Sequence, residues 1–242
     1  MKDYDPKMSF SDQAAAIFHD HRGDETGAVN FLKSVAGAGP VLELAVGTGR
    51  IALPLAQLGL AVDGIDFSPE MVEQLRTKPG GRDLHVEIAD FVDVDVPGKY
   101  SLIYIVWNSF FNVLTQDGQL RCLENVAAHL TDGGCFVVEA FVPSFLHKLD
   151  NDQQVQAESI EAGAVRIGVL QHYAATQTIE QSHVSLSREG IRLDPVAQRY
   201  VWPSELDLMA RMAGLRLQAR WGGWNDEPFD SSSDSHVSVY VR

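Results

Sequence analysis

The sequence is poor in cysteine and in basic residues, and it has no long apolar run. Cys122 and Cys135 are the only cysteines among 242 residues. This scarcity favours a reducing compartment and argues against a thiolate zinc site, which needs closely spaced ligands. No window approaches the roughly 18 apolar residues of a membrane span. The charged start MKDYDPKMSF lacks the apolar core of a secretory signal, so we expect a cytoplasmic protein.

Positive charge is also scarce, because 19 Lys and Arg residues face 33 Asp and Glu residues, for a formal charge of −14. No local basic stripe compensates for this balance. A phosphate backbone or an anionic membrane surface would therefore be repelled. We expect a small-molecule substrate, with neither a nucleic acid nor a membrane as partner.

Short apolar runs alternate with amphipathic stretches between residues 40 and 142. Five strands are predicted at 41–46, 61–66, 84–89, 101–107 and 135–141, each apolar enough to be buried on both faces of a sheet. Helices are predicted at 51–58, 69–78 and 116–130. This order is typical of βαβ units, and it predicts an α/β fold with a mostly parallel sheet in a single domain.

The pattern changes to period two from about residue 165 to residue 201, around the turn signal at 188–190. We expect an antiparallel insert at 144–201 that forms a lid, with a dimer interface or an extension of the core as the alternatives. A helix is predicted to begin at Pro203 and to end at Gly214. Two final strands, 215–221 and 236–241, have no helix between them and should pair antiparallel or lie apart in the sheet. Residues 1–39 are expected to form a helical cap.

The segment ELAVGTGR ends the first predicted strand, and its glycines would let the backbone approach a ligand. The spacing of Gly47, Gly49 and Ala52 also fits a dinucleotide-binding turn, and small residues at such a turn can be purely structural. Pro54 places the start of the next helix near Arg50, which leaves 47–49 as a loop.

Two acidic residues follow neighbouring strands. Asp66 lies 19 positions after Gly47, close to the spacing of a carboxylate that binds a ribose. Its alternative role is to cap the next helix, although Ser68 can do this itself. Asp90 and Phe91 follow the third strand, where an acid and a ring can recognise adenine. Asp90 can equally be an ordinary turn acid.

Together these segments resemble the class I S-adenosylmethionine-dependent methyltransferases, with ELAVGTGR, GIDFSPEM, ADF, SLIYIVWNSF and LTDGGCFVVEAF as their successive motifs. Ala45 stands where many members have a first glycine. The insert and WPSELDLMARMAG resemble bacterial amino-sugar N-methyltransferases and related natural-product tailoring enzymes. The resemblance implies a Rossmann-like seven-stranded sheet with an antiparallel last strand and a β-rich lid after strand five. It also implies S-adenosylmethionine as the cofactor and S-adenosylhomocysteine as its product.

The resemblance implies a set of cofactor-binding residues: Arg22, Glu43, Ala45, Gly47, Thr48, Gly49, Asp66, Phe67, Met71, Asp90, Phe91 and Trp107. Candidates for the substrate pocket are Phe18, His21, Asn108, Phe111, Arg199 and Tyr200, for which core packing or plain solvation is the alternative. No catalytic base is assigned. No acid follows strand four to hold a metal, so we expect direct, metal-free SN2 transfer to a natural-product or sugar-like acceptor.

Two other functions fit part of the pattern. A nicotinamide-dependent oxidoreductase would share Gly47, Gly49 and Asp66, but it should have a second dinucleotide-binding half in the same sheet. A non-catalytic module that binds the cofactor would keep the same turn. The atom that is methylated, the acceptor and the oligomeric state, including a possible homodimer, are left open by the sequence.

Overall fold

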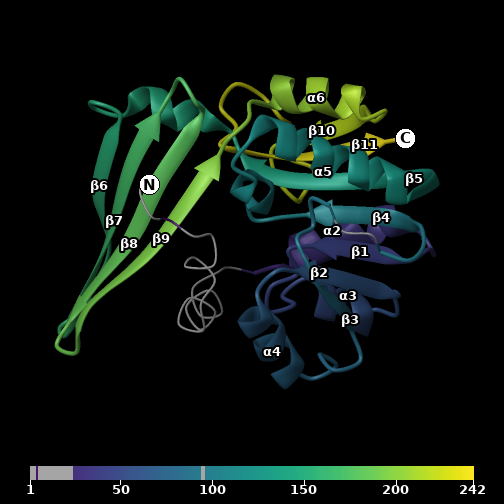
Figure 1. The fold of residues 1–242 in the computed structure, drawn as a ribbon, viewed down its shortest axis with the longest axis horizontal. Coiled ribbons are helices and arrows are strands. Elements are labelled where there is room, and N and C mark those ends of the chain that lie inside the picture. The colour runs from purple at the N-terminus through teal and green to yellow at the C-terminus, as the bar shows by residue number, and fades with distance from the viewer. Residues whose placement is uncertain (1–3, 5–23, 94–95) are drawn as a thin grey trace.

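The computed structural model describes residue 4 and residues 24–93 and 96–242, and its main body is built on a seven-stranded sheet (Figure 1). In spatial order the strands are β10 (Arg216–Trp221), β11 (Ser235–Val241), β5 (Leu130–Phe141), β4 (Tyr100–Ile105), β1 (Val41–Leu44), β2 (Val62–Asp66) and β3 (His85–Ile88). β1 to β5 pair in parallel, whereas β11 is antiparallel to both β5 and β10. The predicted fold class is confirmed, including the antiparallel pair of strands at the end of the chain.

Helices cover both faces of this sheet. The described helices are α2 (Thr26–Ala36), α3 (Ala52–Gln57), α4 (Pro69–Thr77), α5 (Gln116–His129) and α6 (Pro203–Met212). α2 and α3 pack in one apolar cluster with the sheet, and α5 and α6 pack in the other. In residues 24–93 and 96–242, no helix combines the length and the apolar character needed to cross a membrane.

The helix starts follow the capping signals of the sequence. The Ser68 hydroxyl accepts a hydrogen bond from the Met71 amide at 3.2 Å, and Pro69 occupies the first turn of α4. Thr115 caps α5 in the same way through the Gly118 amide, at 3.1 Å. Each cap fixes the residue at which its helix begins. It therefore also fixes the end of the loop that joins the helix to the strand before it.

The expectation that all five parallel strands are buried on both faces is wrong for β3. Three of its four residues are exposed, because β3 lies at the edge of the sheet and has only β2 beside it. A second difference is β6 (Gln153–Ile160), a strand that the period-two pattern from residue 165 onward did not include.

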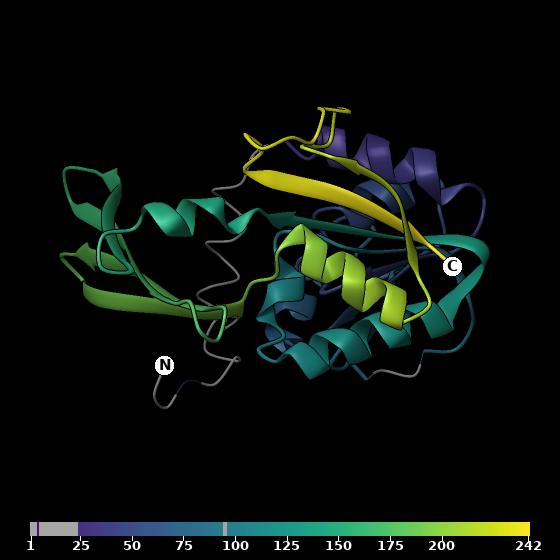
Figure 2. The ribbon, with the colours of Figure 1, turned by 90° about the horizontal axis from the view of Figure 1, so that it is seen from above.

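β6 belongs to a second, four-stranded antiparallel sheet with β7 (Ala164–Tyr173), β8 (Thr178–Ser187) and β9 (Gly190–Arg199). Figures 1 and 2 show this sheet standing beside the main body, joined to it after β5 and before α6. Residues directly opposite each other in the ladders share a face, so the register separates the side chains into two sets.

The two faces of the second sheet differ sharply in polarity. One carries exposed apolar side chains, among them Val155 at 69%, Ile191 at 74% and Leu193 at 62% exposure. The other face carries His183 opposite Gly168 and Asp194. The polar face is the one that borders the cavity described next.

Candidate functional site

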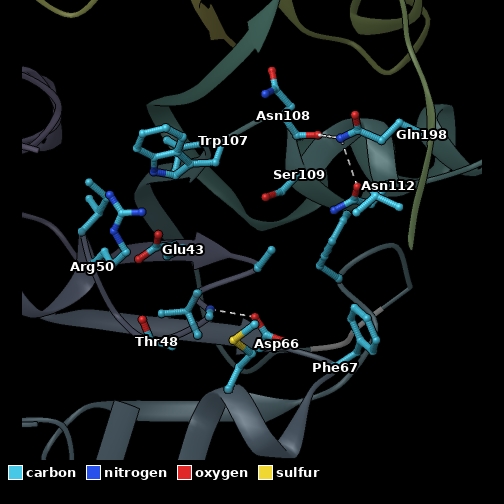
Figure 3. A pocket seen from close by; sticks show the side chains of 18 of the residues that line it. Glu43, Thr48, Arg50, Asp66, Phe67, Trp107, Asn108, Ser109, Asn112 and Gln198 are labelled. Atoms are coloured by element: carbon cyan, nitrogen blue, oxygen red, sulfur yellow. Dashed lines mark hydrogen bonds between the residues drawn. The ribbon is translucent and has the colours of Figure 1, made fainter. Parts of the chain in front are cut away.

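A cavity lies at the carboxyl ends of β1, β2 and β4 and is closed on one side by the second sheet (Figure 3). The carboxyl ends of parallel strands are where open α/β sheets bind their ligands. The lining residues are Glu43, Ala45, Val46, Gly47, Thr48, Arg50, Ile51, Asp66, Phe67, Met71, Phe91, Val106, Trp107, Asn108, Ser109, Asn112, Gln181, His183, Val196 and Gln198.

The turn after β1 lies close to the cavity floor. Ala45, Gly47 and Gly49 all have positive φ, at 58°, 53° and 75°. A Cβ on Gly47 would meet no atom within 4 Å, whereas one on Gly49 would lie 2.9 Å from Leu75. Gly47 therefore leaves open space that a ligand can use, and Gly49 allows close packing of α4. The φ of Ala45 explains why glycine is favoured at this position in the resembling family.

Asp66 connects the end of β2 to this turn. Its Oδ2 accepts a hydrogen bond from the Gly47 amide at 2.7 Å, and its Oδ1 accepts one from the Ser68 amide at 2.9 Å. Burial raises the pKa of the Asp66 carboxyl, while the backbone amides oppose that rise. A carboxylate has about four acceptor positions, so capacity remains for ligand hydroxyls.

Glu43 lies under the same turn and is only 3% exposed. Tyr104 donates its hydroxyl to Glu43 Oε2 at 2.8 Å. Burial raises the pKa of the Glu43 carboxyl to about 8, although the hydrogen bonds from Tyr104 and the Ala52 amide favour the ionised form. Glu43 is therefore a protonatable group at the base of the cavity near neutral pH.

The chain turns sharply after β4. Trp107 and Asn108 both have φ of 59°, a conformation that costs energy for residues other than glycine. Bonds to β5 hold it: the Trp107 amide donates to Glu139 Oε2 and the Phe141 amide donates to Asn108 Oδ1, each at 2.6 Å. The turn presents the Trp107 ring to the cavity, where the Arg50 guanidinium lies 4.8 Å from its centroid.

The second sheet contributes the opposite wall. Gln198 of β9 donates to Asn112 Oδ1 at 3.2 Å and to the Asn108 carbonyl at 3.4 Å, which ties this sheet to the turn after β4 (Figure 3). Gln181 and His183 of β8 line the cavity beside it. The sequence did not predict these three residues, or Arg50, as site residues. The alternation of β8 and β9 does place Gln181, His183 and Gln198 on one face of the second sheet.

The predicted site residues divide into three groups. The cavity brings together ten of them: Glu43, Ala45, Gly47, Thr48, Asp66, Phe67, Met71, Phe91, Trp107 and Asn108. Phe18, His21 and Arg22 lie outside the described residues. The cavity lining does not include the remaining five: Gly49, Asp90, Phe111, Arg199 and Tyr200.

The last group has structural partners instead. Asp90 accepts the Val92 amide at 2.9 Å, as a turn acid does, and Phe111 is fully buried. Arg199 is 7% exposed and pairs with Glu205 of α6 at 2.8 Å. The Tyr200 hydroxyl lies 3.0 Å from Nε2 of His172 on β7. Arg199 and Tyr200 thus fasten the second sheet to the main body rather than line the cavity.

This combination of sheet order, glycine turn and carboxylate at the end of β2 defines an α/β methyltransferase domain. A family model described as a methyltransferase domain matches residues 41–134. The CcbJ methyltransferase from Streptomyces caelestis has 36% sequence identity and a TM-score of 0.91, over 98% of this chain and 99% of that one. The chain belongs to the S-adenosylmethionine-dependent methyltransferases.

The chain is also similar to two more distant proteins. The cypemycin N-terminal methyltransferase of a Streptomyces species is 26% identical over 209 residues, which are 84% of this chain and 82% of that protein. CalS10, an amino pentose methyltransferase from Micromonospora echinaspora, has a TM-score of 0.72 with 17% identity, over 96% of this chain and 98% of that one. The second likeness shows the fold alone.

Replacing Asp66 by alanine should weaken S-adenosylhomocysteine binding by about ten- to a hundredfold, because ligand hydroxyls and the Gly47 amide lose a charged acceptor. Isothermal titration calorimetry measures the change. Asp63→Ala is the matched control, since Asp63 lies on the same strand but bonds the Tyr100 hydroxyl at 2.9 Å, away from the cavity. Equal losses in both variants would contradict a binding role for Asp66.

Glu43 should make the free energy of unfolding pH-dependent. Its folded pKa of about 8 exceeds the usual glutamate value of 4.5, so the folded state holds the proton more tightly. This contribution to stability is present below about pH 4.5 and is lost as the pH rises towards 8. The free energy of unfolding of Glu43→Gln, taken relative to that of the wild type, should therefore rise by on the order of 3 kcal/mol from pH 5 to pH 9. Urea unfolding of both proteins at the two pH values tests this, and a constant difference would contradict it.

Proposed function

We propose that the protein transfers the methyl group of S-adenosylmethionine to an amine nitrogen of a small natural-product or sugar-like acceptor. The observation that carries this proposal is a single cavity with two chemically different walls. The β1 and β2 ends supply the cofactor-type residues Gly47 and Asp66, and the second sheet supplies the polar side chains Gln181, His183 and Gln198. The N-terminal methyltransferase named above supports nitrogen as the acceptor atom.

The cofactor residues fit the group they are proposed to hold. Asp66 keeps acceptor capacity for ribose hydroxyls, and the open space at Gly47 lets the backbone approach the ligand. Phe67, Phe91 and Trp107 supply rings at the cavity edge for adenine or for the sulfonium. S-adenosylmethionine supplies an already activated methyl group, so the chain has to orient the acceptor and exclude water.

Other aspects of the proposed function follow from charge and donor types. The turn after β4 carries Trp107, Asn108 and Ser109, none of which is a carboxylate, which supports transfer without a metal. The formal charge of −14 supports a small acceptor over a nucleic acid. The two cysteines support a cytoplasmic location.

The second sheet is proposed to act as the lid over the acceptor. It follows β5, borders the cavity from the carboxyl ends of the main sheet, and contacts the turn after β4 through Gln198. A cover at this position shuts out water while the parallel sheet holds the cofactor.

The expected result of a substrate screen is release of S-adenosylhomocysteine with amines only. A panel of amino sugars, aminoalkanes and dipeptides would be compared with the same compounds carrying hydroxyl in place of amino. Amines react faster because the neutral nitrogen is the better nucleophile for direct displacement at a methyl group. Turnover should persist in EDTA because no metal is required.

Three results would count against this function or against a part of it. Thermal stabilisation by NAD or NADP, without any by S-adenosylhomocysteine, would favour an oxidoreductase. Methylation of hydroxyl compounds at rates equal to those of amines would remove the nitrogen preference. Loss of turnover in EDTA that magnesium restores would contradict metal-free transfer alone.

A homodimer is proposed to form through the apolar face of the second sheet. Its exposed side chains Val155, Ile160, Ile191 and Leu193 form a patch that an isolated chain would leave in water. Light scattering should give twice the mass of 26.6 kDa, and Ile191→Lys with Leu193→Lys should return the mass to that of one chain. A monomeric wild type would contradict the dimer.

A further inference from the structure

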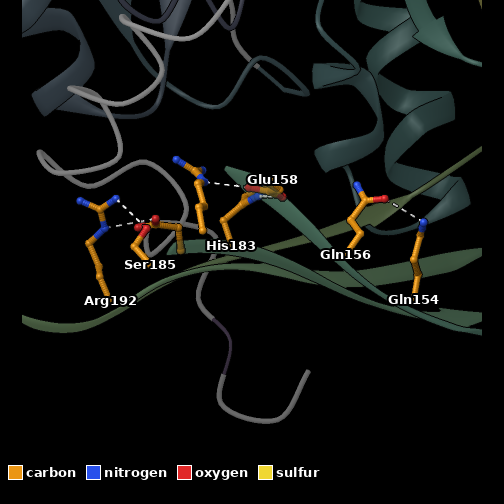
Figure 4. Close-up of polar contacts among 8 residues, drawn as sticks. Gln154, Gln156, Glu158, His183, Ser185 and Arg192 are labelled. Carbon is orange, nitrogen blue, oxygen red and sulfur yellow. Dashed lines mark hydrogen bonds and ion pairs between the residues drawn. The ribbon is translucent and has the colours of Figure 1, made fainter. Parts of the chain in front are cut away.

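A charged cluster lies on the cavity side of the second sheet (Figure 4). Glu158 of β6 reaches two neighbours at once: its Oε1 lies 2.6 Å from His183 Nδ1, and its Oε2 accepts from Arg166 Nε at 2.8 Å. Only His183 of these three lines the cavity. Glu158 and Arg166 therefore influence the cavity only through the imidazole of His183.

A glycine makes this contact possible. Gly168 lies between Gln156 and His183 in the ladder, and a Cβ built on it would lie 2.5 Å from Glu158 Oε1. The Glu158 carboxylate of β6 thus passes over Gly168 of β7 and reaches His183 on β8. Any side chain at position 168 would push Glu158 away from the imidazole.

The contact also fixes which ring nitrogen carries the hydrogen. An ionised carboxylate only accepts, so His183 Nδ1 donates to Glu158, and the neutral ring keeps its lone pair on Nε2. Among the described residues, Nε2 has no hydrogen-bond partner. A ring held in this way is prepared to take a proton from a group in the cavity.

We propose that His183 is the proton acceptor for the amine substrate, with Glu158 as its positioning residue. This inference rests on the proposed function. An ammonium acceptor R–NH3⁺ gives one proton to His183 Nε2 and becomes R–NH2, whose lone pair is then free. The N–C bond forms as the methyl C–S bond breaks, and the pair of that bond stays on sulfur. The product is R–NH2⁺–CH3, and the imidazolium later loses its proton to water.

The charged groups around the imidazole support this role. Glu158 and Arg166 neutralise each other, and Asp194 of β9 lies opposite His183 in the ladder while paired with Arg192 at 3.2 Å. Across the cavity, Glu43 and Asp66 accept hydrogen bonds from Tyr104 and from backbone amides, and Arg50 lies over Trp107. His183 differs from these groups in that it lies on the wall formed by the second sheet and has a whole ring nitrogen without a partner among the described residues.

A binding measurement tests the proposal without any acceptor. Sinefungin carries an amino group where S-adenosylmethionine carries its methyl sulfonium, and S-adenosylhomocysteine carries neither. The sinefungin ammonium can donate to His183 Nε2, whereas S-adenosylhomocysteine has no group at that place. The ratio of the two Kd values, sinefungin over S-adenosylhomocysteine, should rise about tenfold in His183→Leu, which lacks the accepting atom. In His183→Gln the ratio should rise less, because the amide oxygen can still accept.

Two glycine variants provide a matched pair. Gly168→Ala should give the result of Glu158→Gln, a rise in the ratio, because the imidazole loses the carboxylate that orients its Nε2. Gly163→Ala lies in the β6–β7 turn, where a Cβ would meet no atom within 4 Å, and should behave as the wild type. Glu158→Asp should restore part of the wild-type response.

Turnover supplies the second readout. With an amine from the screen, kcat/KM of His183→Gln should be lower than that of the wild type at pH 7. It should recover as the pH is raised to the range in which the amine is free of its extra proton. The kcat/KM of the control variant His85→Gln, on exposed β3, should equal that of the wild type. An unchanged binding ratio in His183→Leu, or an unchanged pH profile in His183→Gln, would overturn the proposal. Two other results would instead contradict the proposed function itself: a wild type that does not bind S-adenosylhomocysteine, or one that methylates hydroxyl compounds faster than amines.

Discussion

The hydrogen bond from the Gly47 amide to Asp66 holds together the part of the molecule on which the cavity depends. At 2.7 Å it joins the turn after β1 to the end of β2, and the second oxygen of the same carboxylate accepts from the start of the segment that leads into α4. The geometry of two loops is thus set by one side chain. Because that side chain is buried, its pKa is raised, and only the amide donors favour the ionised form that a ribose requires.

The main sheet was predictable because its signals are local. Apolar runs mark β1, β2, β4 and β5, and caps such as Ser68 and Thr115 mark helix starts within a few residues of those runs. The parallel pairing followed from the alternation of strands and helices, whereas the seven-stranded sheet with an antiparallel last strand was implied by the family resemblance. The exposure of β3 was not predictable from its own residues, because it depends on the strand being at an edge, which is a property of the whole sheet.

The residues on the cofactor side of the site lie in short contiguous segments of the sequence, so most of them could be predicted. The acceptor side was not, because it depends on register between strands that are far apart in the sequence. Glu158 lies on a strand that the pattern did not reveal, and Gly168 gains meaning only when it is opposite His183. Arg199 and Tyr200 were chosen for their side-chain types, but their burial and their bonds to Glu205 and His172 make them anchors.

The second sheet reverses the usual arrangement, in which the apolar face packs inward and the polar face meets water. Its polar face meets the cavity, and its outer face exposes Ile191 and Leu193. The apolar contact of the inner face is confined to a few side chains, such as Ile179 and Leu170, which pack against the core of the main body. Specific bonds at the end of the sheet add to this contact, from Gln198 to Asn112 and from Arg199 to Glu205. Beyond this contact the inner face carries charged and polar side chains, among them the Glu158 and His183 pair.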